Sequence, residues 1–192
     1  MQFKNWCLTF LNVYRYLETV SNSIDKLIKE LIKKTSFSNS ITTYEVANKV
    51  IEYTERKKNL INLNIIVRDA LKRMKPIDVK ILVLYYRDGM KSVEIANLLG
   101  MAHRTFFRRK GLAVESFCRC VRSFGFDERY FEKKFSKEYW LMNVYYEMEN
   151  KSVQEEQLFE NKLQEYRFLK GLTMDLSKVS VGTFNTYNSL SS

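Results

Sequence analysis

Apolar side chains recur at alternating intervals of three and four residues in the first part of the chain. Between residues 8 and 34 the repeat comprises Phe10, Val13, Leu17, Val20, Ile24, Leu27 and Leu31. This is the a/d spacing of a coiled coil, and the charged side chains fall off the stripe. The pattern predicts one long amphipathic helix over these residues.

A second long helix is predicted after a polar interruption, which reads KKTSFSNSITTYE. Thr42 followed three residues later by Glu45 has the form of a capping box, which satisfies two free N–H groups at a helix start. The helix should end before Pro76, because the residue before a proline avoids helical backbone angles. The apolar seam of this helix comprises Val46, Val50, Tyr53, Leu60, Val67, Leu71 and Met74.

Two long helices joined by a short linker predict an N-terminal helical hairpin. Its apolar seam either closes on itself or is shared with another chain, which would make the protein a homo-oligomer through the hairpin. Lys57 and Asn64 occupy the two polar positions of the seam. They are either simply exposed, with the lysine stem lying along the surface, or they control the register of the seam.

Three further helices separated by glycines are predicted from Pro76 onward. Pro76 suits the first turn of a helix, and Gly89 suits its end. A short helix over residues 92–99 ends at Gly100, and a longer helix runs from about 103 to 122. The expected buried positions are Val79, Leu82, Val83 and Tyr86, then Val93, Ile95, Ala96 and Leu99, then Phe106, Lys110, Ala113, Val114 and Phe117. This order has helix-turn-helix spacing.

Composition favours an all-α fold and an anionic partner. The 192 residues include one proline and six glycines, which are too few for the turns of a sheet protein. The 32 basic and 22 acidic side chains give a net charge of +10, which favours nucleic acid or an acidic membrane face as the partner. Half of that excess lies between residues 101 and 122. The charged side chains there are Arg104, Arg108, Arg109, Lys110, Arg119 and Arg122, with Glu115 as the acid.

A resemblance to a known family lies in the segment RDGMKSVEIANLLGMAHRTFFRRKGLAVESF. It resembles the fourth conserved region of bacterial sigma factors, which reads the −35 promoter element. The matching positions are Gly89, Glu94, Ile95, Ala96, Leu98, Leu99, Gly100 and Thr105. Across residues 8–117 the chain looks like phage and prophage transcriptional activators of the ArpU and RinA type. The resemblance implies a sequence-specific, DNA-binding transcriptional regulator that acts with RNA polymerase.

Three positions depart from the family pattern. Ala102 stands where a serine caps the recognition helix, and the missing cap forgoes about 1 kcal/mol. Lys91 replaces the cap of the preceding helix, and Phe106 is bulkier than the family's valine. Nothing in the first 75 residues resembles the part of a full sigma factor that binds the −10 element. A regulator is therefore favoured over a stand-alone initiator.

The candidate DNA-binding residues lie at the start of the second helix of the helix-turn-helix. Those residues enter the major groove in such proteins, where arginine pairs with guanine O6 and N7. The candidates are His103, Arg104, Thr105, Phe107, Arg108, Arg109 and Lys110. The predicted partner is double-stranded DNA. The alternative is an adaptor that binds RNA polymerase or a sigma factor without reading DNA.

Catalysis, metal binding and membrane insertion find little support. Cys7, Cys118 and Cys120 with the single His103 are a poor set of zinc ligands, and no catalytic constellation or phosphate-binding glycine loop occurs. We expect no enzyme activity, no metal and no cofactor. No apolar run is long enough to span a membrane, so we expect a cytoplasmic, nucleoid-associated protein.

The chain is expected to divide into four parts. These are a helical hairpin over residues 1–62, a helix-turn-helix DNA-binding domain over 63–122, a helical extension over 123–171 and a disordered tail over 172–192. The tail lacks apolar periodicity and is rich in Ser, Thr and Asn. Within the extension, Trp140, Tyr145 and Tyr146 are expected in the core or an interface, in preference to stacking on bases.

Overall fold

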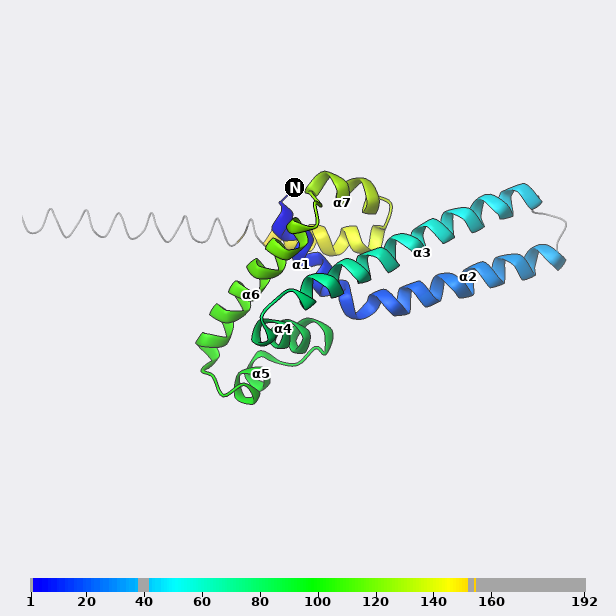
Figure 1. The fold of residues 1–192 in the computed structure, drawn as a ribbon. Helices are drawn as coiled ribbons and strands as arrows, with labels where there is room; N and C mark the ends of the chain where they lie inside the picture. Colours follow the sequence, from blue (N-terminus) through cyan, green and yellow to red (C-terminus); the bar gives the residue numbers. More distant parts are fainter. Residues whose placement is uncertain (1, 38–41, 152–153, 155–192) are drawn as a thin grey trace, which may run out of the picture. The chain divides into compact units, whose positions relative to one another are not determined.

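The chain is described by a computed structural model over residues 2–37, 42–151 and 154. These residues are almost all helical and include no strand, which confirms the predicted all-α class (Figure 1). The described residues up to Glu149 form one compact unit, and the chain from Asn150 onward belongs to a second. All contacts given below lie within the first unit.

The helices follow one another through short connections. Their bounds are α1 (Phe3–Val13), the 3-10 turn η1 (Tyr14–Tyr16), α2 (Leu17–Phe37), α3 (Thr43–Lys72), α4 (Pro76–Leu82), the π-helical segment η2 (Val83–Arg87), α5 (Ser92–Leu98), α6 (His103–Ser123) and α7 (Glu128–Phe135). A helical stretch over residues 139–151 follows α7.

The prediction of a single helix over residues 8–34 is wrong, because the 3-10 turn η1 separates α1 from α2. α1 packs against α3, α6 and α7, whereas α2 packs against α3. The expected stripe is kept only in part across this division, since Phe10 and Val13 on α1 and Leu17 and Ile24 on α2 are buried. Val20 is only partly buried and Leu27 is 46% exposed, although both belong to the expected seam. The buried side chains of α2 include Leu17, Ser21 and Ile24.

α2 and α3 pack along each other within one chain (Figure 1). α3 begins with the predicted capping box. The Thr42 hydroxyl accepts from the Glu45 N–H at 3.3 Å, and the Glu45 carboxylate accepts from the Thr42 N–H at 3.0 Å. These hydrogen bonds lower the pKa of the Glu45 carboxyl. Lys57 fits neither of the two expectations, simple exposure or control of the register of the seam. Instead it forms an ion pair with α2, where its Nζ lies 2.6 Å from Asp25 Oδ1.

The main core gathers aromatic side chains from α1, α7 and the stretch 139–151. The ring centroids of Trp6 and Tyr145 are 4.6 Å apart, and those of Phe10 and Phe131 are 4.7 Å apart. All four side chains are fully buried. Tyr145 therefore lies in the core, as the sequence predicts, whereas Tyr146 is 47% exposed.

The expected division between residues 62 and 63 falls inside α3, which continues without a break. Side chains from both sides of that position join the same core, for example Leu60 and Leu63. The expected extension is helical over most of its described part. The tail expected over 172–192 lies outside the described residues. None of the described helices has the length and apolar character needed to cross a lipid bilayer.

Candidate nucleic-acid interface

A small apolar cluster separate from the main core holds the first turns of α6. Its buried members are Ile81 on α4, Ile95 and Ala96 on α5, and Phe106 on α6. The Phe106 side chain is fully buried, and its ring centroid lies 6.1 Å from that of Tyr85. These contacts orient the start of α6 against two other helices. Val93, which the sequence predicted to be buried, is 54% exposed because it lies on the outer side of α5.

The turn between α5 and α6 closes through two backbone hydrogen bonds. The Met101 N–H donates to the Ala96 carbonyl at 2.9 Å, and the Gly100 N–H donates to the Asn97 carbonyl at 3.1 Å. This pair of bonds is the Schellman ending of a helix. Gly100 has a φ of +62°, the left-handed conformation that glycine adopts at least cost. Gly100 therefore ends α5 as the sequence predicts.

α6 begins without a side-chain cap, since Ala102 occupies the N-cap position. A contact between the two helix starts lies beside this position. The His103 Nε2 atom and the Ser92 hydroxyl are hydrogen-bonded at 2.9 Å. The preceding helix keeps half of a capping box, because the Glu94 carboxylate accepts from the Lys91 N–H at 3.2 Å. Each helix start thus has one polar restraint in place of a hydroxyl cap.

The candidate residues lie on different sides of α6. The exposed ones are His103, Arg104, Phe107, Arg108 and Arg109, and the partly buried ones are Thr105 and Lys110. Lys110 points to the inner side, where its Nζ lies 4.0 Å from the Tyr85 ring centroid. Such a contact engages the charge in a cation–π interaction. Arg104 and Arg108 are one helical turn apart on the outer side, and neither forms an ion pair with any described residue.

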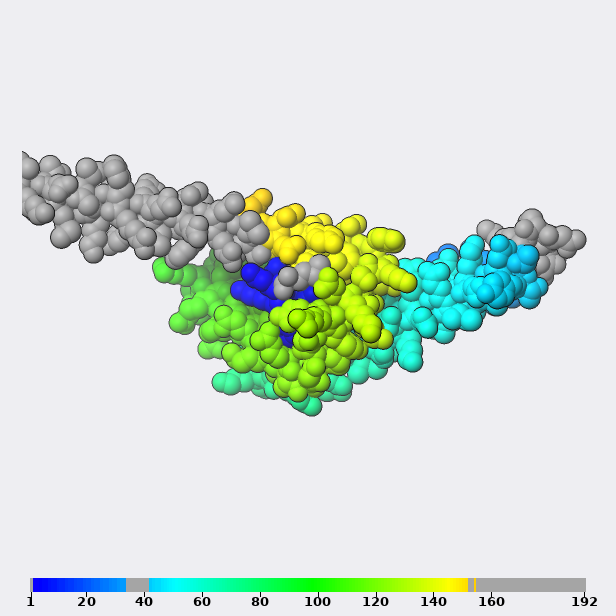
Figure 2. Space-filling model, turned by 90° about the horizontal axis from the view of Figure 1, so that it is seen from above, coloured from blue at the N-terminus to red at the C-terminus, as the bar shows by residue number. Residues whose placement is uncertain are grey.

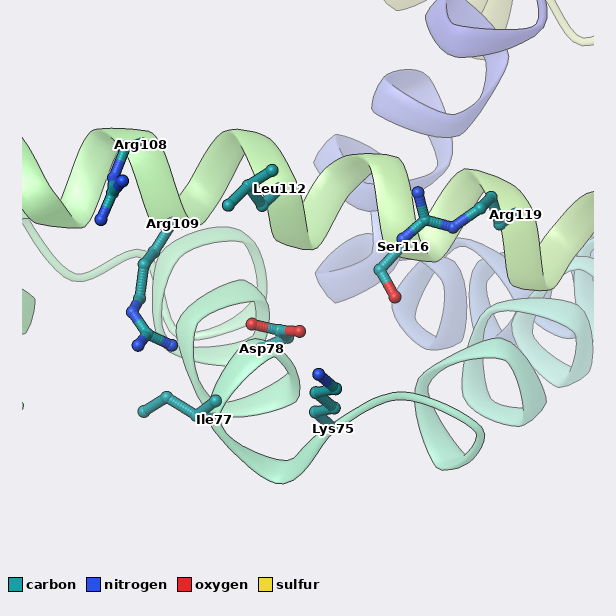
Figure 3. A pocket seen from close by; sticks show the side chains of 8 residues that line it. All are labelled: Lys75, Ile77, Asp78, Arg108, Arg109, Leu112, Ser116 and Arg119. Carbon is teal, nitrogen blue, oxygen red and sulfur yellow. The ribbon is translucent and has the colours of Figure 1, made fainter.

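A cavity of about 380 Å³ lies between α6 and the start of α4 (Figure 3). Four of its lining residues are basic and one is acidic. They are Lys75, Arg108, Arg109 and Arg119, with Asp78 as the acid. Figure 3 shows Arg109 reaching from α6 toward the start of α4. This excess of positive charge in a concave surface suits an anionic group such as a phosphate.

The sequence reasoning missed Lys75 and Arg119 as site residues. Arg119 lies 11 positions after Arg108, which is three helical turns and therefore the same side of α6. That spacing in the sequence indicates that Arg119 and Arg108 share one side of α6. Lys75 gave no such signal, because it reaches the cavity only through the packing of α4 on α6.

Two of the three cysteines, Cys7 and Cys118, contact each other. The hydrogen bond to Cys118 on α6 and burial raise the pKa of the Cys7 thiol on α1, and the same bond lowers the pKa of Cys118. All three cysteines are free thiols. Within residues 2–37, 42–151 and 154, no group of three or more His, Cys, Asp or Glu side chains is arranged to hold a metal ion.

Comparisons of this chain with protein-family models, with curated proteins and with solved structures find no match. The functional assignment therefore depends on the residues of α4, α5 and α6 themselves.

Gly111 offers a test of the placement of α6. It lies inside the helix on the exposed side, and a Cβ there would meet no atom within 4 Å. Alanine stabilises a helix interior relative to glycine by about 0.5–1 kcal/mol. We expect Gly111→Ala to raise the free energy of unfolding by about that amount, measured by urea denaturation. Gly100→Ala is the control and should lower it, because a Cβ is strained at a φ of +62°. Destabilisation by Gly111→Ala would contradict this placement.

Proposed function

We propose that the chain is a sequence-specific DNA-binding transcriptional regulator in which α5 and α6 act as a helix-turn-helix. The observation that carries the proposal is the combination found on α6. Its first turns are anchored by a buried apolar cluster, while Arg104 and Arg108 project outward without an ion-pair partner among the described residues. A helix held in this way presents its side chains to a groove at little further cost in conformational entropy.

The arginines of α6 have two different roles in this proposal. Arg104 reads base edges, since a guanidinium pairs with guanine O6 and N7 in the major groove. Arg108 is one turn further along α6 and serves both roles, because it also lines the basic cavity. Arg109 and Arg119, together with Lys75, hold backbone phosphates in the basic cavity. Phosphate contacts fix the orientation of the protein on DNA, and base contacts supply the sequence preference. No bond is made or broken, so we propose a binding role and not an enzyme.

The resemblance to the fourth region of sigma factors suggests where in the cell's transcription machinery the regulator acts. Gly89 and Gly100 both end helices in the left-handed conformation, with φ values of +69° and +62°. These are two of the positions that match the family pattern. We therefore propose that the regulator acts beside RNA polymerase at phage or prophage promoters, in the cytoplasm and associated with the nucleoid.

The salt dependence of DNA binding tests the proposal. A target is first selected from a random DNA pool, and its affinity is then measured by fluorescence anisotropy at several salt concentrations. If about five phosphates are neutralised, log K should fall against log salt with a slope of about −4 to −5. Arg119→Ala should make the slope less negative by about 1, and it should weaken binding to all DNA sequences by the same factor. Arg104→Ala should relax the base preference at one position, at a cost of about 1–3 kcal/mol for the best sequence.

Lys49→Ala is the matched control for these variants, because Lys49 is an exposed basic residue on α3. It should leave both the slope and the base preference unchanged. A slope near zero for the wild-type protein would refute DNA binding.

A second candidate function is an adaptor that binds RNA polymerase or a sigma factor without reading DNA. The observation in its favour is the exposure of two large apolar side chains on α5, Val93 at 54% and Leu98 at 58%. Exposed apolar side chains are common singly, but two on one short helix suit a protein contact. Capture of purified polymerase that survives nuclease treatment, together with no DNA bound in the selection, would favour this candidate.

A further inference from the structure

α3 carries a second apolar stripe, whose members each follow a position of the seam with α2 by one residue and therefore lie about 100° around the helix from that seam. The stripe repeats at intervals of three and four residues and comprises Ala47, Ile51, Thr54, Lys58, Ile61 and Ile65, which we call the outer stripe. All six residues are exposed. The exposed fractions of its isoleucines are 58% for Ile51, 43% for Ile61 and 48% for Ile65. Figure 2 shows that the cyan surface of α3 extends beyond the green and yellow parts of the described chain.

The two polar members of the outer stripe are compatible with an apolar contact. The Thr54 hydroxyl donates to the Val50 carbonyl at 2.7 Å within α3, so its polar atom is already satisfied and its methyl group is free. Lys58 has a long aliphatic stem that can lie along an apolar partner while the amine stays in water. The stripe therefore has the a/d character of a coiled-coil surface over about five helical turns.

We propose that the outer stripe is a homodimer interface, in which α3 packs antiparallel against α3 of a second copy. The stripe is complementary to itself in that direction. When the two helices cross at the level of residue 56, Ile51 faces Ile61, Ala47 faces Ile65 and Thr54 faces Lys58. Each of these pairs joins an a position of one copy to a d position of the other, so large side chains meet small or apolar ones throughout.

The charges of the stripe select the antiparallel arrangement. In a parallel pair, Lys58 of one copy would face Lys58 of the other, and like charges in direct opposition are destabilising. In the antiparallel pair the amine of Lys58 instead falls beside Glu55 of the second copy, and two-fold symmetry makes this contact twice. This opposite-charge pairing identifies a second copy of the chain as the partner.

The oligomeric state of the full-length chain tests the proposal. Sedimentation velocity over a range of concentrations should show a monomer–dimer equilibrium. Combining Ile51→Glu with Ile61→Glu should raise the dissociation constant by at least about a hundredfold, since each buried charge removes an apolar contact. Both side chains are exposed in the single chain, so thermal unfolding of the monomer should stay near that of the wild type. Val93→Glu is the control at an equally exposed site on α5 and should leave the dimer intact.

A charge exchange tests the direction of packing. Lys58→Glu alone and Glu55→Lys alone should each weaken the dimer by about tenfold, because each places like charges together. The double exchange should restore the dimer to near the wild-type affinity. A chain that is monomeric at every concentration, or a dimer that tolerates the two glutamates in the stripe, would overturn the proposal. A double exchange without recovery would overturn the antiparallel pairing.

Discussion

Replacing Phe106 by alanine is expected to lower the free energy of unfolding by about 3–5 kcal/mol. The side chain is fully buried among Ile81, Ile95 and Ala96, so its removal leaves a cavity inside the small cluster. The expected loss is a large part of the total stability of a domain, which is about 5–15 kcal/mol. Urea denaturation followed by circular dichroism measures the change.

Phe107→Ala is the matched control for this experiment. Phe107 is the next residue on α6 and has the same side chain, but it is 45% exposed. Removing it should cost less than about 1 kcal/mol, which is typical of surface positions. Equal losses of unfolding free energy in the two variants would contradict the orientation of α6, in which Phe106 faces the small cluster and Phe107 does not.

Replacing Arg56 by methionine is expected to cost about 3–5 kcal/mol, because it would leave the Glu138 carboxylate buried without a cation. Glu138 is 2% exposed. It accepts two hydrogen bonds from the guanidinium of Arg56, at 2.9 and 3.1 Å, and a third from the indole N–H of Trp140 at 3.3 Å. These bonds connect α3 to the stretch 139–151. Thermal and urea unfolding of the variant measure the loss.

Lys57→Met is the control for Arg56→Met, since Lys57 is the next residue on α3 and also forms an ion pair. Its partner Asp25 has a side chain 39% exposed. A pair of this kind contributes about 0–1 kcal/mol. Combining Arg56→Met with Glu138→Leu should recover most of the loss, because both charges then leave the interior. Similar losses for Arg56→Met and Lys57→Met would contradict the burial of Glu138.

Local signals in the sequence predicted the helix ends well. Thr42 with Glu45, Pro76, Gly89 and Gly100 each act within a few residues of themselves, through a cap, a fixed φ or a left-handed backbone. The break at Tyr14–Tyr16 had no such signal. It contains neither proline nor glycine, and the apolar repeat continues across it. On its two sides α1 packs mainly against α6 and α2 packs mainly against α3, and only the folded chain provides these contacts.

Contacts between distant parts of the chain account for what the sequence did not predict. Arg56 and Glu138 are 82 positions apart, so no spacing rule connects them. The basic surface of α6 was visible in the sequence from the run of arginines. The cavity that Lys75 and Arg109 line was not, because it depends on how α4 packs against α6. The outer stripe of α3 was not predicted for a different reason. The seam toward α2 already explained why this segment forms a helix, so a second stripe was not needed.

α6 takes part in two apolar clusters, one near its start and one further along the helix. Phe106 belongs to the small cluster near the helix start, whereas Phe117 and Val121 belong to the main core. A ligand bound at the first turns of α6 would raise the free energy needed to open the small cluster locally, by an amount set by its binding free energy. A variant that weakens only the main core would therefore keep the geometry at Arg104 up to the point of global unfolding, so melting temperature would be a poor guide to which variants keep the proposed DNA binding.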